Sequence, residues 1–133
     1  MGSAGLIFKN PDDEAKLPTL DFRVLCILDT LRMWAITQQC PTVRITDIDT
    51  PEVHQENGPH YRKQAIDGGI EPFGLTKLES FADWINSTYD YGRGYRVMLV
   101  GKWDPNGKHN NHWHIQVPPP YHLKGRIALD GVR

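Results

Sequence analysis

The sequence predicts a single α+β domain in which a small antiparallel sheet packs against helices. Three observations lead to this prediction. The length of 133 residues suits one hydrophobic core. Two segments carry apolar residues at helical spacing, and several short β-rich segments are separated by Gly- or Pro-containing turns. Two helices combined with several short strands favour the α+β class, with residues 1–133 as one unit.

The first helix is expected from about Thr19 to Gln38, after an extended arm at residues 1–17 that is polar and interrupted by proline. Thr19 can cap the start of this helix, and Pro41 stops whatever follows it. The apolar residues that recur at helical spacing are Leu20, Val24, Ile27, Leu28, Leu31 and Ala35.

The second helix is expected over residues 76–88, where Thr76 and Glu79 have the spacing of a capping box. The apolar stripe of this helix comprises Leu78, Phe81, Ala82 and Ile85. Asp104 to Gly107 form a strong turn signal. The segments expected to be extended are 42–49, 65–70, 95–100 and 113–117.

Composition and charge exclude several classes of protein. Hydrophobic residues make up 39% and charged residues 23%, which is ordinary for a globular domain. The formal net charge of −1 gives no reason to expect nucleic acid or an anionic membrane as a partner. No apolar run approaches the roughly 20 residues of a membrane span. The first residues lack the pattern of a Sec-type signal peptide, so we expect a protein that is cytoplasmic as synthesised or exported by another route. We also expect a monomer.

The two cysteines are expected to be free thiols. If the first helix continues between Cys26 and Cys40, the 14 positions between them span about 21 Å. A disulfide needs Cα atoms within about 7 Å of each other. Two cysteines without a second pair also make a cysteine-based zinc site unfavourable.

Histidines cluster in two short segments and give the main functional signal. His60 and Asp67 form an H-x6-D pattern, and His109, His112 and His114 form an H-x2-H-x-H pattern. Strand geometry predicts that His112 and His114 share one face, which leaves the other face of that strand for the core.

These residue types suit a catalytic zinc site with three protein ligands and one open position for water. His60, Asp67 and one histidine of the second segment would supply the ligands. The remaining imidazoles could transfer protons or stabilise an oxyanion. The alternative is that these histidines are accidental surface residues.

The two patterns resemble those of the zinc D-Ala-D-Ala carboxypeptidases, a group related to lysostaphin-type endopeptidases, murein endopeptidases and the hedgehog signalling domain. The usual first motif is H-x-x-G-x-A-x-D. His60, Ala65 and Asp67 match it, and Lys63 stands where glycine is usual. The second motif, H-x-x-H-x-H, is matched by His109, His112 and His114.

The resemblance implies a hedgehog/D-Ala-D-Ala-peptidase-like fold and a Zn²⁺ cofactor bound by His60, Asp67 and His114. It implies that His112 is the general base or acid and that His109 assists it at the transition state. The implied substrate is bacterial peptidoglycan, at a stem peptide or a cross-bridge.

The substrate-binding arginine of the family is absent from this chain. The family often has a Ser-Gly-x-Arg element before the first motif, and residues 46–51 here read Thr-Asp-Ile-Asp-Thr-Pro. Arg44 and Arg62 are the preferred replacements, and Lys63 or Arg93 could also serve. A carboxypeptidase and an endopeptidase, including a phage lysin, are therefore equally open.

Two other functions stay open at this point. One is a non-catalytic zinc-containing domain that binds a peptide or protein, and the other is a zinc hydrolase of amides outside the cell wall.

Other polar and aromatic residues have simpler structural interpretations. We expect Asp47 and Asp49 at a solvated strand end and His54 and His122 at the surface, and core positions for Trp34, Trp84 and Trp113.

Overall fold

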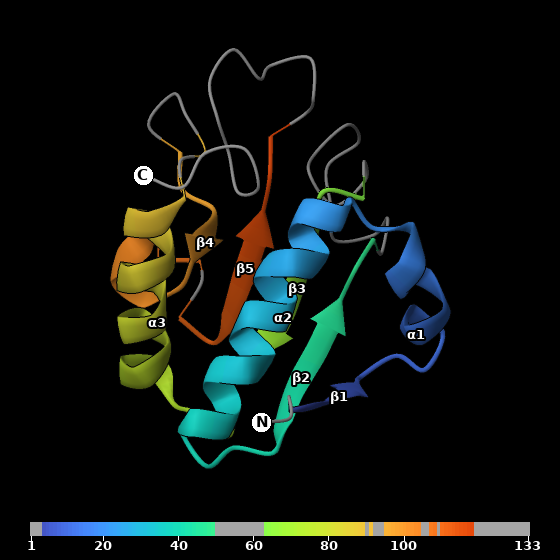
Figure 1. Cartoon of the computed structure of the whole chain (residues 1–133), viewed down its shortest axis with the longest axis horizontal. Coiled ribbons are helices and arrows are strands. Elements are labelled where there is room, and N and C mark those ends of the chain that lie inside the picture. Colours follow the sequence, from blue (N-terminus) through green and yellow to red (C-terminus); the bar gives the residue numbers. More distant parts are fainter. Residues whose placement is uncertain are drawn as a thin grey trace.

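A computed structural model describes residues 4–49, 63–89, 91, 95–104, 107–108 and 110–118. Within these ranges the chain is an α+β domain with three α-helices and one five-stranded sheet (Figure 1). The elements in chain order are β1 (Gly5–Phe8), α1 (Asp13–Lys16), a 3₁₀ turn (Leu17–Thr19), α2 (Phe22–Thr37), β2 (Thr42–Asp47), β3 (Ala65–Gly69), α3 (Leu75–Thr88), β4 (Met98–Leu99), a second 3₁₀ turn (Gly101–Trp103) and β5 (His112–Gln116).

The sheet has the strand order β1-β2-β3-β5-β4 and is mixed, so the prediction of an antiparallel sheet is only partly correct. β2, β3, β5 and β4 pair antiparallel, whereas β1 pairs parallel with β2. A parallel pair needs a long crossover, and α2 supplies it between β1 and β2.

The first residues are not an extended arm. Gly5–Phe8 form the edge strand β1, and Asp13–Lys16 form the one-turn helix α1. The short apolar run Gly-Leu-Ile-Phe gains its hydrogen-bonding partner only from β2, about 37 residues further along the chain. Local sequence therefore gave no signal for the pairing.

α2 confirms the first predicted helix, although a different residue caps it. The Asp21 carboxylate accepts a hydrogen bond from the backbone N–H of Arg23 at 3.0 Å and so caps the first turn. Thr19 lies in the preceding 3₁₀ turn, where its hydroxyl donates to the carbonyl of Lys16. The buried apolar residues of α2 are Val24, Ile27, Leu28, Leu31 and Ala35.

α3 confirms the second predicted helix but not its capping box. Gly74 is the N-cap residue, with φ +85°, and no side chain caps this end. The Glu79 carboxylate accepts instead from the backbone N–H of Lys102 at 2.7 Å. Glu79 therefore connects α3 to the turn after β4. This tertiary contact uses the carboxylate that the capping box would have needed.

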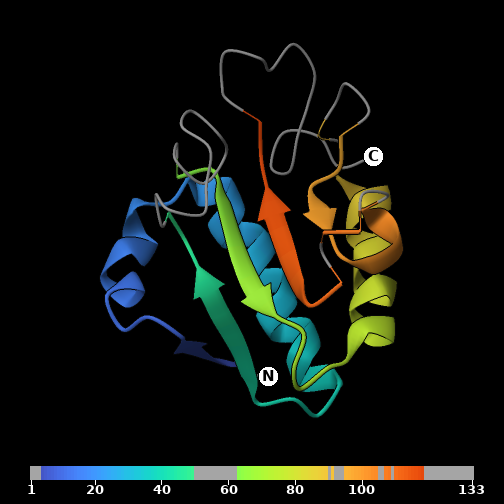
Figure 2. The same cartoon turned by 180° about the vertical axis from the view of Figure 1, so that it is seen from behind.

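The two sheet faces differ in what covers them. α2 crosses one face, whereas the reverse view shows β2, β3 and β5 with none of the described helices in front (Figures 1 and 2). On the helix-covered face the Trp113 ring lies over Gly68, the cross-strand partner of Trp113, because a Cβ at Gly68 would come within 1.9 Å of the ring. Trp113 is completely buried there, as predicted.

Other expectations have mixed outcomes. Cys26 and Cys40 are free thiols, as predicted. Trp34 packs against the core and contacts Phe81, with ring centroids 4.9 Å apart, but Trp84 is half exposed rather than a core residue. In the described parts of the chain, none of the helices has both the length and the apolar character needed to cross a membrane.

Candidate functional site

Strand register brings Asp67 and His114 together on the sheet face opposite the helices. The two residues are direct cross-strand partners in β3 and β5. Their neighbours Ile66 and Ile115 are fully buried, and the period of two along a strand directs the polar side chains to the other face. His114 Nδ1 lies 2.8 Å from Asp67 Oδ1, and each residue is only 7% exposed. The structure therefore joins one residue from each predicted motif.

Gln116 is hydrogen-bonded to the second ring nitrogen of His114. The distance from His114 Nε2 to Gln116 Oε1 is 2.9 Å, and Gln116 Nε2 donates to the backbone carbonyl of Arg96 at 2.9 Å. Gln116 was not among the predicted site residues. The available signal was its position two residues after His114, which places a polar amide on the same strand face.

His112 lies on the same face, one position further along the strand. Its cross-strand partner is Gly69, and its Nδ1 is 2.7 Å from the Asn111 side-chain oxygen. Two residues along a strand correspond to about 7 Å, so His112 is close to the Asp67–His114 pair without being part of it. The prediction that His112 and His114 share a face is consistent with this register.

Arg44 extends over the strand that carries Asp67. A Cβ at Gly69 would come within 3.2 Å of Arg44 Cδ, so the missing side chain of Gly69 leaves room for the Arg44 stem. Arg44 is exposed, and Gly69 in turn pairs with His112. Arg44, one of the arginines predicted to bind substrate, is thus separated from His112 by a single intervening strand, β3.

Asp47 is not at a solvated strand end. It is 9% exposed and lies opposite Asp67 in the β2–β3 register. The regular pattern breaks between Ile45, which pairs with Gly68, and Asp47, which pairs with Asp67. Such a bulge turns a strand locally, and it aligns Asp47 with the Asp67–His114 row.

Asp49 is held by two lysines. Lys16 Nζ donates to its carboxylate at 2.8 Å, and Lys63 Nζ donates to the other oxygen. Burial alone would raise the pKa of Asp49, but the hydrogen bonds from Lys16 and Lys63 outweigh that effect and lower the pKa. Asp49 therefore connects α1 to the residues that precede β3, and it is ion-paired rather than simply solvated as expected from the sequence.

Several predicted site residues lie outside the described residues. Of the five residues assigned to the zinc site and its proton transfer, His60 and His109 lie outside. Arg62, one of the two preferred arginines, also lies outside. Arg93, His54 and His122 also lie outside those ranges. Within the residues that the structure does describe, no group of three or more His, Cys, Asp or Glu side chains could hold a metal ion.

The facing atoms of the Asp67–His114 pair nevertheless need a proton or a metal ion between them. The backbone carbonyl of Arg96 can only accept, so Gln116 must direct its amide N–H to that carbonyl and its oxygen to His114. His114 Nε2 therefore carries a proton. A neutral imidazole then has a lone pair on Nδ1 facing the Asp67 carboxylate, which is unfavourable unless a proton or a metal ion lies between them.

The pair also fits zinc by chemistry and spacing. Carboxylate oxygen and imidazole nitrogen are both zinc donors. Two ligand atoms on one tetrahedral zinc lie about 3.3 Å apart, roughly 0.5 Å more than the observed separation. A small side-chain movement is therefore sufficient, and His114 Nε2–H would keep its hydrogen bond to Gln116.

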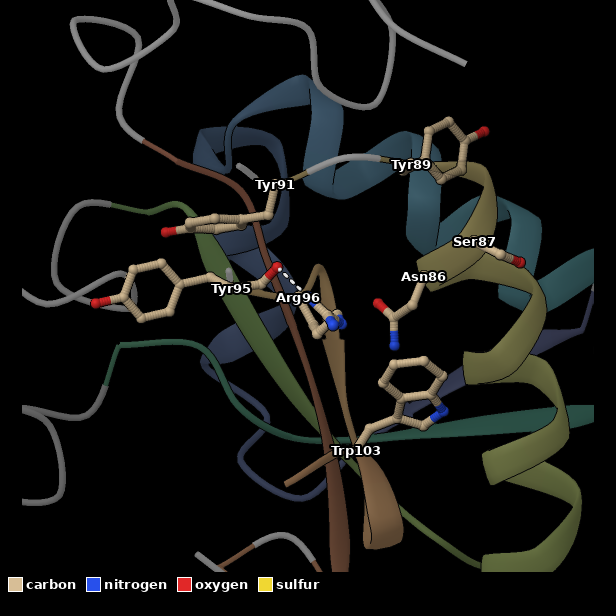
Figure 3. A pocket seen from close by; sticks show the side chains of 7 residues that line it. All are labelled: Asn86, Ser87, Tyr89, Tyr91, Tyr95, Arg96 and Trp103. Atoms are coloured by element: carbon tan, nitrogen blue, oxygen red, sulfur yellow. Dashed lines mark hydrogen bonds between the residues drawn. The ribbon is translucent and has the colours of Figure 1, made fainter. Parts of the chain in front are cut away.

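A separate pocket lies beside the C-terminal end of α3, between it and the residues that flank β4 (Figure 3). Its cavity volume of about 150 Å³ is small beside ligand pockets of roughly 300–1,000 Å³, so it suits a single chemical group. The Arg96 guanidinium lies 5.6 Å from the centre of the Trp103 ring. The lining residues are Asn86, Ser87, Tyr89, Tyr91, Tyr95, Arg96 and Trp103, none of which belongs to the predicted site.

Comparisons with protein-family models, with curated proteins and with solved structures found no match to this chain. The geometry of the Asp67–His114 pair and its surroundings therefore carries the functional argument.

Proposed function

We propose that this protein is a zinc-dependent peptidase that hydrolyses peptide bonds of bacterial peptidoglycan. The observation that carries the proposal is the buried Asp67–His114 pair, in which a carboxylate oxygen and an imidazole nitrogen, both zinc donors, face each other. His60 is proposed as the third ligand, from the first motif. A hedgehog/D-Ala-D-Ala-peptidase-like arrangement of the sheet and helices belongs to the same proposal.

The backbone at Lys63 supports the alignment of the first motif. Lys63 has φ +61°, in the left-handed region that favours glycine. The resembling family usually has glycine at this motif position. A left-handed backbone at position 63 is consistent with a motif position where glycine is usual, although the residue here is lysine.

The proposed chemistry divides the residues into ligands and proton carriers. A bound zinc ion would acidify a water molecule and polarise the substrate carbonyl. Asp67 and His114 bind on the site face, whereas His112 lies one position along the strand with a partly exposed imidazole. His112 is proposed to take the proton of the attacking water and pass it to the departing amine, and His109 to assist.

Arg44 is the proposed substrate-binding residue among those described. Peptidoglycan stem peptides carry carboxylates, and a guanidinium binds a carboxylate through two parallel hydrogen bonds. The Arg44 stem lies over Gly69, beside His112, and its side chain is exposed. In this position Arg44 suits a substrate carboxylate near the cleaved bond. That carboxylate could belong to the end of a peptide chain or to a residue within a stem peptide.

The decisive experiment is incubation of the zinc-loaded protein with purified peptidoglycan, followed by mass spectrometry of the released fragments. We expect soluble peptides whose masses identify the bond. Asp67→Asn should abolish the release, because it removes the ligand charge without changing the side-chain volume. The matched control is Asp29→Asn, which makes the same change on the exposed face of α2.

Two results would argue against the peptidase. Unchanged release by Asp67→Asn would remove the site assignment. Zinc binding by the wild type without release of any fragment would favour the non-catalytic peptide-binding domain.

The fragments also identify the type of peptidase. Loss of terminal D-Ala alone would identify a carboxypeptidase, whereas cleavage inside stem peptides or cross-bridges would identify an endopeptidase.

A further inference from the structure

We infer that Gln116 is a positioning residue that fixes the proton of His114 on Nε2 and thereby presents Nδ1 to Asp67 and to the proposed zinc ion. The inference rests on the proposed function for its consequence in zinc binding. The position of the proton follows from the structure independently of any activity.

The first step is the orientation of the Gln116 amide. Gln116 is 7% exposed, and its side-chain N–H donates to the Arg96 carbonyl at 2.9 Å. Rotating the amide by 180° would place its oxygen against that carbonyl and its NH₂ group against His114. Because two acceptors would then face each other beside a buried side chain, the observed orientation is the favourable one.

The second step concerns the imidazole. With the Gln116 oxygen 2.9 Å from His114 Nε2, that nitrogen must donate a proton. The opposite tautomer would place a nitrogen lone pair against the amide oxygen. The proton on Nε2 leaves Nδ1 as the atom that faces Asp67 Oδ1 at 2.8 Å. Metal-bound histidines generally fix their tautomer through such a hydrogen bond from the second ring nitrogen.

The third step is the choice of residue. Ile115 and Val117, on either side of Gln116, are fully buried apolar residues. Gln116 alternates with them onto the site face, opposite Ala65 of β3. A buried amide has a high desolvation cost unless both of its ends are bonded, and here His114 and Arg96 bond them. Gln116 thus connects His114 to the backbone of the segment that leads into β4.

The test compares Gln116→Met, which keeps the length of the side chain but removes both hydrogen bonds, with the wild type. Zinc affinity is measured by competition with a chromogenic chelator, using the metal ion alone. Long-range ¹⁵N–¹H spectra report which nitrogen of His114 carries the proton, in zinc-free and zinc-loaded protein. Gln38→Met at the C-terminal end of α2 is the matched control.

In the wild type we expect Nε2 of His114 to be protonated with and without zinc. Gln116→Met should weaken zinc binding by about 10- to 100-fold, the usual effect of losing the partner of a metal-bound histidine. Its Nε2 proton should exchange with water faster or be lost. Gln38→Met should leave both measurements unchanged.

A second variant separates positioning from a purely structural role. Gln116→Glu keeps an acceptor for His114 Nε2 but loses the donor to the Arg96 carbonyl. We expect it to keep the proton on Nε2 and to bind zinc within a few-fold of the wild type. A loss as large as that of Gln116→Met would show that the Arg96 contact is what matters, and it would overturn the inference.

The inference and the proposed function can fail separately. Unchanged zinc affinity and an unchanged Nε2 signal in Gln116→Met would overturn the inference while peptidoglycan cleavage still supported the function. Conversely, an Nε2 proton that depends on Gln116, in a protein that releases no peptidoglycan fragments, would uphold the inference and remove the peptidase.

Discussion

Lys63 shows how one residue links the backbone to the proposed site. It is one of two non-glycine residues with positive φ among those described, the other being Gln39. Its ammonium group binds Asp49, and its backbone carbonyl accepts from the N–H of Asp21 at 2.8 Å. The side chain and the backbone of Lys63 are thus both bonded to other segments, immediately before β3 and Asp67.

Replacing Lys63 by glycine and by alanine should separate the backbone strain from the ion pair. Both variants lose the contact with Asp49, but only glycine accepts φ +61° without a Cβ clash. We expect Lys63→Gly to be about 1 kcal/mol more stable to urea unfolding than Lys63→Ala. Equal stabilities, or a more stable alanine variant, would show that position 63 is not left-handed in solution.

The residues of the site could be predicted from the sequence only in part. Asp67, His112 and His114 carry side chains that can bind metal, so the pattern alone singles them out as candidates. Gln116 offers only its position two residues after His114, because its role also depends on the Arg96 carbonyl 20 residues away. Asp47 was misjudged, because the bulge that sets it opposite Asp67 is a property of strand pairing.

At the scale of elements, periodicity predicted those whose core face is long and regular. α2, α3, β3 and β5 were all found within a few residues of their observed bounds. β1 was missed because its pairing is non-local, and β4 was expected over 95–100 but contains only Met98 and Leu99. Asn86 provides part of the reason, since its side chain makes two hydrogen bonds to the backbone of Met98 at the free edge of the sheet.

The β3–β5 pairing depends on Gly68. A Cβ there would meet the Trp113 ring at 1.9 Å and the Arg44 carbonyl at 2.5 Å, and a backbone atom cannot move aside easily. We expect Gly68→Ala to lower the free energy of unfolding by about 1–3 kcal/mol, through overpacking. Urea unfolding followed by Trp fluorescence measures this loss, and Gly5→Ala is the control, where the nearest atom would be 3.9 Å away. A loss of similar size in both variants would remove the steric explanation.

The tie between α1 and the β2 end predicts a pH-dependent stability. The pKa of Asp49 in the folded protein lies below its usual value of 3.8, because Lys16 and Lys63 bind the ionised form. The contribution is therefore present above about pH 4 and is lost as the pH falls through the folded pKa.

Asp49→Asn should remove this contribution. We expect the variant to be about 1 kcal/mol less stable than the wild type at pH 7, a modest value because the lysine side chains are partly exposed. The difference should shrink as the pH is lowered below 4. Urea unfolding at several pH values measures it, and a difference that stays constant with pH would contradict the ion-pair explanation.

At the scale of the whole molecule, the fold places the residues of the proposed site on one face of the sheet. The helix-covered face holds the apolar core, whereas the strand register places the Asp67–His114 pair, Gln116, His112 and Arg44 on the opposite face. Antiparallel sheets commonly pack one face on the core and carry polar residues on the other. The predicted residues His60 and His109, which lie outside the described ranges, stay predictions.

The last prediction treats zinc as a ligand of the whole folded chain. An ion that binds only the folded state stabilises it by RT ln(1 + [L]/Kd), about 2.7 kcal/mol at 100 times Kd. For a domain of this size that corresponds to a rise in Tm on the order of 10 °C. We expect this rise in the wild type, and its loss in Asp67→Asn, His114→Ala and His60→Ala.

His112→Ala should behave differently from the ligand variants. His112 pairs with Gly69 rather than with Asp67, and a fourth protein ligand would close the position that water needs. We therefore expect this variant to keep the zinc-induced rise in Tm while losing about 10²- to 10⁴-fold in peptidoglycan cleavage, the usual size of general acid–base catalysis. Calorimetry and cleavage on the same preparation test both parts. If His112→Ala loses the rise in Tm, His112 is a ligand, and if it keeps full activity, the proton is carried by another group.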